Sequence, residues 1–241
     1  MSFTIEDMVL IAEKRYEMQF LAGRKGWSNS ISWVHLLEDT TIIQNFWGKE
    51  LAVTTGLGFA EKEDWMHLAQ QLNRHHASGL IINVGQYIFE VPEELKAYCD
   101  ENDLPLLTVP WEVHLSEMIK DFSIRVFLQD NADEQIMSAL ISAIETPDNQ
   151  EAYRKELLQY FDVDGSFQVL LLTCEGLDAM DTVERKKLSY RIQVYLEEIT
   201  HNASFFYYNS DFVLVANAVP EEFLYRLAEG TIRRANRRMP G

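Results

Sequence analysis

The chain has 241 residues, and its 38 Asp and Glu against 21 Lys and Arg give a formal net charge of −17 at pH 7. Affinity for DNA comes largely from Lys and Arg side chains that neutralise phosphates, so this balance argues against a chain that binds DNA by itself. A hydrophobic fraction of 47% is typical of a folded globular protein. No apolar run approaches the roughly 18 residues of a membrane helix, and no secretory signal opens the sequence, so we expect a cytoplasmic protein.

The first half of the sequence alternates helices with short apolar strands. Thr4 is placed to cap a helix that begins at Ile5, with Asp7 at the capping-box position. Short apolar strands separated by helices favour a parallel sheet with right-handed crossovers. The predicted fold class is therefore α/β, beginning with a parallel-sheet βαβαβ domain. We expect strands over 31–38, 51–55, 80–84 and 104–109, and helices over 61–78 and 92–101.

The carboxyl ends of these strands locate a candidate ligand site, because open α/β sheets bind ligands there. The ends carry hydroxyls, an amide, backbone that can be approached closely and an aromatic ring, a mixture that suits a small polar or planar ligand. The alternative is that the glycines only turn the chain and that the tryptophan packs on the next helix. The residues concerned are Thr54, Thr55, Gly56, Asn83, Gly85 and Trp111.

The strand over 31–38 adds three further candidates. Trp33 and His35 share one face of this strand, and Glu38 lies just beyond it. His35 and Glu38 could form a general acid–base pair, but we favour a hydrogen bond with a structural role. No nucleophile–His–acid arrangement with useful spacing occurs elsewhere, so no catalytic residue is assigned and no enzyme is expected. Cys99 and Cys174 are expected to be buried, reduced thiols, and neither a metal site nor a cofactor is expected.

Residues 113–146 are predicted to form a long connecting helix. Two apolar stripes on it, over 115–127 and 136–144, are separated by the polar segment 129–134. This pattern suits a helix that leaves one domain and packs on something else. Contact with a second copy of the chain and packing within the same chain both remain open. The helix should end before Pro147, because the residue that precedes a proline avoids helical geometry.

The remainder is predicted to be a smaller α+β region. Strand, helix, hairpin and helix in this order form the front portion of a cyclase-like or ferredoxin-like domain. Such a domain needs at least one more strand and helix, so the expected second domain is partial. We expect helices over 151–161, 182–200 and from about 220 to 238, a strand over 168–173, and a hairpin over 205–216 that turns at Asn209-Ser210-Asp211.

Several of these motifs together resemble one family. Trp33-Val34-His35, Glu38, Gly48, Glu50-Leu51 and Thr54-Thr55-Gly56-Leu57-Gly58 resemble the N-terminal domain of the PucR family of purine-catabolism regulators. Gly79–Gly85, Val91-Pro92, Leu104-Pro105 and Val109-Pro110-Trp111 continue the resemblance in the same order. The second half is similar to the degenerate GGDEF-like domain of the PucR and CdaR group.

This resemblance implies a bacterial, ligand-responsive transcription regulator of purine, nitrogen or amino-acid catabolic genes. It implies a sensing domain over 1–125, a connector helix over 126–150 and a partial GGDEF-like domain over 151–241. Family members carry a C-terminal helix-turn-helix for which this sequence has no room, so we expect DNA contact only through a module absent from this chain. Asn209-Ser210-Asp211 stands where an active diguanylate cyclase carries Gly-Gly-Asp/Glu-Glu-Phe, so nucleotide cyclisation is not expected.

The leading hypothesis is therefore an effector-sensing region, in a homodimer that does not contact membranes. A small metabolite, whose identity the sequence does not give, would bind the first domain and bias how the connector helix and second domain associate. One alternative is a small-metabolite enzyme that uses His35 and Glu38, and another is a dimerisation module without a ligand. The candidate effector-binding residues are Trp33, His35, Glu38, Thr54, Thr55, Gly56, Asn83, Gly85 and Trp111.

Overall fold

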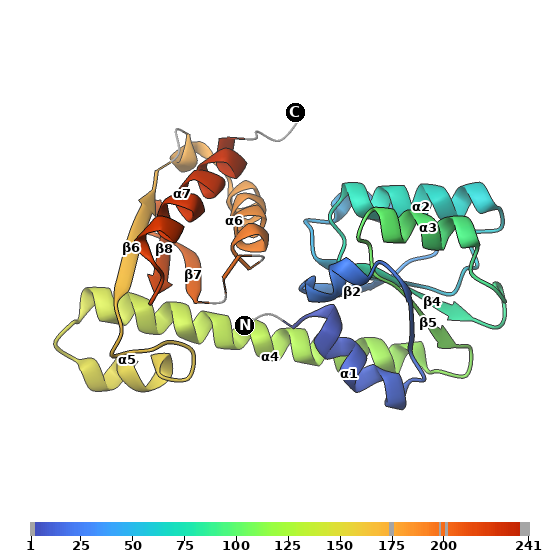
Figure 1. The fold of residues 1–241 in the computed structure, drawn as a ribbon, viewed down its shortest axis with the longest axis horizontal. Helices are drawn as coiled ribbons and strands as arrows, with labels where there is room; N and C mark the ends of the chain where they lie inside the picture. The colour runs from blue at the N-terminus through green and yellow to red at the C-terminus, as the bar shows by residue number, and fades with distance from the viewer. Residues whose placement is uncertain (1–2, 174–175, 198, 201, 237–241) are drawn as a thin grey trace. The chain divides into compact units, whose positions relative to one another are not determined.

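The computed structural model describes residues 3–173, 176–197, 199–200 and 202–236 of the chain. It divides the chain into two compact units, one up to Gln129 and the other from Asp130 onward, and each unit is described by itself (Figure 1). Within the described ranges, no helix is both long enough and apolar enough to span a bilayer. Cys174 and the expected helix end at Arg238 lie outside the described residues.

The first unit contains a five-stranded, mostly parallel sheet, which confirms the predicted α/β class. Strands β2 to β5 are parallel, and β1 pairs with β5 in the antiparallel sense. The strand order is β1-β5-β4-β3-β2. We did not predict β1, because it is short and only one of its four residues is buried. The bounds are β1 (Gln19–Ala22), β2 (Trp33–Leu36), β3 (Glu50–Thr54), β4 (Gly79–Val84) and β5 (Leu106–Pro110).

Helices cover both faces of this sheet, so that it separates two hydrophobic cores (Figure 1). Ala52, Leu80 and Leu106 point into one core, while the neighbouring residues Leu51 and Ile81 point into the other. Because β2 to β5 follow one another in sequence order, all the crossovers between them lie on the same face. On that face lie η2 (Thr41–Asn45), α2 (Lys62–Arg74) and α3 (Glu93–Glu101), whereas η1 (Arg24–Ser28), α1 (Ile5–Arg15) and the start of α4 (Leu115–Glu145) contribute to the opposite face.

Local signals set the ends of these helices. At the start of α1 the Asp7 amide donates to the Thr4 hydroxyl (3.2 Å) and the Thr4 amide donates to the Asp7 carboxylate (3.0 Å), which confirms the predicted capping box. The predicted end of α2 at Ser78 was too late. This helix stops at Arg74, and His76 adopts a left-handed φ of 55° that a helix cannot accommodate.

The long helix α4 runs unbroken for 31 residues, close to the predicted range of 113–146. The polar segment 129–134 is helical as well, and the boundary between the two units falls inside it. Phe122 and Val126 pack in a core of the first unit, whereas Ile136 and Leu140 pack in a core of the second. Residues of one helix therefore stabilise both units.

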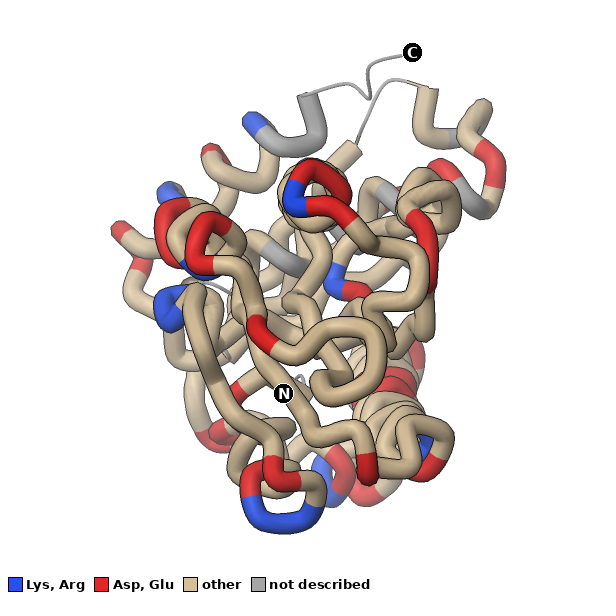
Figure 2. Tube along the Cα trace, turned by 90° about the vertical axis from the view of Figure 1, so that its right-hand side faces the viewer, with Lys and Arg blue, Asp and Glu red and all other residues tan. Residues whose placement is uncertain are grey.

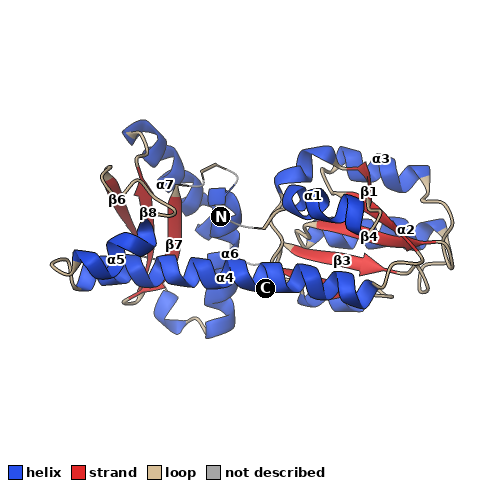
Figure 3. Cartoon of the chain, turned by 90° about the horizontal axis from the view of Figure 1, so that it is seen from below, coloured by secondary structure: helices blue, strands red, loops and turns tan. Residues whose placement is uncertain are grey.

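The second unit is an α+β fold with a three-stranded antiparallel sheet in the order β6-β8-β7 (Figure 3). The predicted hairpin is present, and Asn209 and Ser210 at its turn have φ of 49° and 69°, as a type I′ turn requires. Helix α5 ends at Leu157, four residues before its predicted end at Phe161. The bounds are α5 (Gln150–Leu157), β6 (Phe167–Leu172), η3 (Leu177–Ala179), α6 (Thr182–Glu197), β7 (Ala203–Tyr208), β8 (Asp211–Asn217) and α7 (Glu221–Asn236).

Candidate functional site

A carboxylate network joins the carboxyl ends of β2 and β3. The Glu38 carboxylate accepts hydrogen bonds from the Thr55 amide (3.0 Å), the Thr55 hydroxyl (2.6 Å) and the Thr54 hydroxyl (3.0 Å). Thr54 is fully buried, and its hydroxyl oxygen accepts a further bond from the Gly56 amide (3.1 Å). Four of the predicted site residues are thus brought together. Their polar groups bind one another, so the network holds two strand ends in place.

Close packing of the backbone explains the glycines that follow β3. Gly56 has a φ of +86°, and a Cβ at this position would lie 3.1 Å from Ile88. A Cβ on Gly58 would collide with the carbonyl oxygen of Glu38. These positions require glycine for steric reasons alone. The alternative that the glycines only turn the chain therefore accounts for both residues without a ligand.

His35 and Trp33 lie apart from this network. His35 stacks on Phe46 with 5.0 Å between the ring centroids, and its burial lowers its pKa below the ordinary value. Trp33 lies at the amino end of β2, in register with Glu50, and is 50% exposed. In the described part of the chain no hydrogen bond or ion pair joins His35 to Glu38. The hydrogen bond that we expected between them is therefore not formed.

Hydrogen bonds and close packing join the ends of β4 and β5. Asn83 is buried, and its side-chain amide donates to the carbonyl oxygens of Pro110 (2.6 Å) and Val109 (3.4 Å). Gly85 has a φ of +132°, and a Cβ there would lie only 2.8 Å from the Cβ of Trp111. The structure therefore brings Asn83, Gly85 and Trp111 to one edge, as the sequence predicted.

Two exposed aromatic residues at this edge were not predicted from the sequence. The Tyr87 ring meets the Trp111 ring edge to face, with 5.7 Å between the centroids. Phe89, in the same loop, is more exposed than any other large apolar residue described. The signal in the sequence was the occurrence of two aromatic residues in the short segment between Gly85 and Pro92.

A polar hollow of about 450 Å³ opens beside the end of β5, on the face covered by α1 and α4. Its volume falls within the range of about 300–1,000 Å³ that is usual for small-molecule sites. Apart from Pro110 at the strand end, none of its lining residues was predicted from the sequence to belong to the site. The lining consists of Arg15, Tyr16, Glu17, Pro110, Glu112, Val113, His114 and Glu117.

The charged residues that line this hollow are predominantly acidic, since Glu17, Glu112 and Glu117 line it together with one arginine, Arg15. Acidic positions also recur along the whole described trace, with fewer basic ones between them (Figure 2). Behind the hollow, Asp121 accepts a hydrogen bond from the Tyr16 hydroxyl (3.3 Å) and pairs with Arg15 (3.2 Å). Burial, and then the charge of Asp121, raise the pKa of Tyr16 above its ordinary value. Tyr16 is therefore a neutral hydroxyl that is held in one orientation.

Residues 9–126, which are 118 of the 241, match the model of the purine catabolism regulatory protein-like family, PucR. The matched part of the first unit is therefore similar to a PucR-type regulator domain, and the first unit is called the PucR-type domain below. The match ends before Asp130, so the second unit lies outside it. No curated protein and no solved structure matched the chain.

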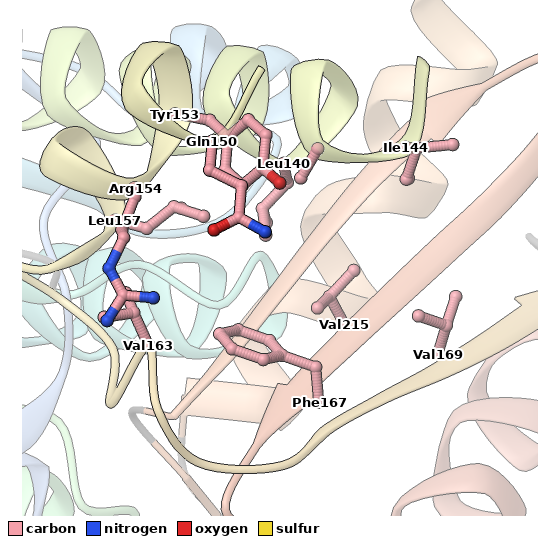
Figure 4. Close-up of a pocket in the computed structure, with 11 residues that line it drawn as sticks. Leu140, Ile144, Gln150, Tyr153, Arg154, Leu157, Val163, Phe167, Val169 and Val215 are labelled. Atoms are coloured by element: carbon pink, nitrogen blue, oxygen red, sulfur yellow. The ribbon is translucent and has the colours of Figure 1, made fainter. Parts of the chain in front are cut away.

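A second hollow, of about 320 Å³, lies in the unit that follows the PucR-type domain (Figure 4). Two of its polar side chains are bonded within the unit, because Arg154 donates to Asp164 (2.6 Å) and the Tyr153 hydroxyl donates to the Pro147 carbonyl (2.8 Å). The rest of the lining is mainly apolar, with Gln150 as a further polar side chain. Its apolar lining comes from the last turns of α4, from α5 and from the sheet, and includes Leu140, Ile144, Leu157, Val163, Phe167, Val169 and Val215.

Within the described residues, no group of three or more His, Cys, Asp or Glu side chains is placed to hold a metal ion. Cys99 is fully buried in the core of the PucR-type domain, and this burial raises the pKa of its thiol to about 12. Since the thiolate is the reactive form, Cys99 is an inert core residue.

Proposed function

We propose that this chain is the effector-sensing and coupling region of a PucR-type transcription regulator of purine, nitrogen or amino-acid catabolic genes. The family match over residues 9–126 carries the regulatory part of the proposal. The effector site is proposed at the carboxyl edge of the sheet, where the polar hollow lies beside β5. Open α/β sheets bind ligands at this edge, which supports the location.

The chemistry of the hollow favours a small, nitrogen-rich metabolite. Glu17, Glu112 and Glu117 offer carboxylate oxygens to N–H donors, as a purine, a ureide or an amino acid would present them. The Arg15 guanidinium can donate hydrogen bonds to a carboxylate or a polarised carbonyl oxygen on the same ligand. Of the residues predicted from sequence, Asn83, Gly85 and Trp111 fix the neighbouring loop, and the Glu38 network fixes the adjacent strand ends.

The proposed coupling runs through α4, which begins at the hollow. The His114 carbonyl accepts the amides of Glu117 (3.0 Å) and Met118 (3.1 Å), so a residue of the hollow forms the first turn of this helix. The same helix continues to Glu145 in the second unit, which is the GGDEF-like part in this proposal. A ligand biases the helix only if it binds one arrangement of this first turn more tightly than another.

Thermal unfolding in the presence of purines, ureides and amino acids tests the proposal. All five tryptophans lie before Gln129, so their fluorescence follows the PucR-type domain alone. We expect at least one class of compound to raise the midpoint, because a ligand that binds only the folded state stabilises it. If no compound shifts the midpoint of a cooperatively unfolding domain, the sensing proposal fails.

Variants locate the site. His114→Ala and Glu117→Gln should abolish the ligand-induced shift, whereas Glu63→Gln, an exposed acid in the first turn of α2, should leave it unchanged. If the ligand-induced shift persists in both variants of the hollow, the ligand binds the PucR-type domain at a place other than the hollow.

The alternative of a small-metabolite enzyme required His35 and Glu38 to act together. Glu38 is bonded to Thr54 and Thr55, and His35 is stacked on Phe46. Since no observation places these two side chains on a common substrate, we do not propose this activity.

A further inference from the structure

The middle of α4 is apolar on two opposite faces. Phe122 and Val126 on its inner face are almost completely buried in the core of the first unit. On the outer face, Ile124 is 48% exposed, and Phe127 and Leu128 are each 61% exposed. A helix that is apolar all round is normally buried on all sides, so three large exposed side chains at spacings of three and four residues indicate a missing partner.

The charges that flank this outer face are arranged symmetrically. Lys120 lies seven residues before Phe127, and Glu134 lies seven residues after it. Seven residues are close to two helical turns, so both charges share the outer face with Phe127, each about 10 Å from it along the axis. Both side chains are exposed, and neither is paired within the described chain.

We propose that the outer face of α4, formed by Lys120, Ile124, Phe127, Leu128 and Glu134, docks a second copy of this chain in an antiparallel, two-fold arrangement centred at Phe127. A two-fold contact uses the same patch on both copies. In this arrangement Lys120 of each copy lies at the level of Glu134 of the other, so that two opposite-charge pairs form. A parallel arrangement would set Lys120 against Lys120 and Glu134 against Glu134, which is repulsive.

The same axis accounts for the apolar residues. The two Phe127 side chains meet at the centre, and Ile124 of one copy lies beside Leu128 and Asn131 of the second copy, within a few ångströms along the helix. Three large side chains per copy make a small contact, at the lower end of specific interfaces. The proposed dimer is therefore reversible and dependent on concentration. This surface shares no residue with the effector site, because none of its residues lines the hollow.

Sedimentation equilibrium on the full chain tests the docking surface. The wild-type chain should show a reversible monomer–dimer equilibrium, and Leu128→Glu should be monomeric throughout. Leu10→Glu is the matched control, because Leu10 is 70% exposed on α1 and lies outside this surface, so this variant should dimerise as the wild type does. Circular dichroism verifies that each variant is folded. A monomeric wild type, or a Leu128→Glu variant that dimerises like wild type, would overturn the proposal.

Charge exchange tests the antiparallel direction. Lys120→Glu and Glu134→Lys should each weaken the dimer about tenfold, since each turns two attractive pairs into two like-charge pairs. The double variant restores both pairs with their signs exchanged, so it should return close to the wild-type dissociation constant. If the double variant is weaker than either single variant, or if the single variants dimerise like wild type, the antiparallel arrangement is wrong.

Discussion

Replacing Glu50 by glutamine is expected to destabilise the first unit although the side chain keeps its size. Glu50 is only 7% exposed at the start of β3. One of its carboxylate oxygens accepts the Trp47 amide (2.7 Å) and the other accepts the Gly48 amide (2.8 Å). A glutamine offers one oxygen and one NH₂ group, so whichever way it is turned, one backbone N–H faces another donor.

The expected magnitude follows from this unmet donor. A buried polar group left without a partner costs about 1–3 kcal/mol, which corresponds to a rise of roughly five- to 150-fold in the unfolding equilibrium constant. Burial raises the pKa of Glu50 above its ordinary value of 4.5, against the hydrogen bonds from the Trp47, Glu50 and Gly48 amides. The folded state therefore binds the proton of the Glu50 carboxyl group more tightly than the unfolded state does. The contribution of Glu50 to stability then falls as the pH rises from the ordinary pKa of the unfolded state to the higher pKa of the folded state. The difference in the free energy of unfolding between wild type and Glu50→Gln should become smaller as the pH rises between these two pKa values.

Urea unfolding followed by tryptophan fluorescence measures this effect in the first unit alone, because every tryptophan lies there. Glu63→Gln, which replaces an exposed acid on α2, is the matched control and should unfold at the wild-type midpoint. Equal midpoints and equal m values for wild type and Glu50→Gln at pH 7 would refute the argument that both carboxylate oxygens are needed as acceptors.

Three further predictions follow from the same geometry. Gly85→Ala should lower the unfolding free energy of the first unit by about 1–3 kcal/mol, because of its φ of +132° and its contact with Trp111; an unchanged urea midpoint would argue against this strain. Thr55→Val, which removes the hydroxyl donor to Glu38, should cost about 1 kcal/mol, whereas Thr55→Ser should unfold near the wild-type midpoint. Cys99 should remain unmodified by iodoacetamide at pH 8 until urea unfolds the first unit, since its thiol pKa is about 12. Peptide mass spectrometry identifies the labelled cysteine, and labelling of Cys99 in the native protein at the rate seen in the unfolded protein would contradict its burial.

The parallel strands could be predicted from sequence because burial on both faces gives them continuous apolar runs. Leu51–Val53 and Leu80–Ile82 are fully buried, and glycines follow both strands, so local composition marked their position and their ends. Strand β1 has no such signal. It lies at the edge of the sheet and pairs only with β5, more than 80 residues later in the chain, so a tertiary contact rather than local composition determines it.

The same distinction between local composition and tertiary contacts applies to the residues of the candidate site. Glu38, Thr54 and Thr55 could be grouped from sequence because neighbouring parallel strands place their carboxyl ends together. Trp33 was placed with them by strand periodicity, yet it lies at the opposite end of β2. The hollow could not be predicted in this way, since its walls come from the end of α1 and the start of α4, and the distance from Arg15 to His114 along the chain carries no local signature.

The continuity of α4 follows from its composition and ties the two proposals together. No glycine or proline occurs between Leu115 and Glu145, so nothing in the polar segment 129–134 terminates the helix, and the chain leaves it only before Pro147. Glu117 lines the hollow, and the outer face begins one turn later at Lys120. An effector that moves this first turn acts on the same helix that would carry the second copy. By linkage, the factor by which the effector changes the dimerisation constant equals the factor by which dimerisation changes effector affinity. An effector that leaves the dimerisation constant unchanged would therefore show that the hollow and the outer face act separately.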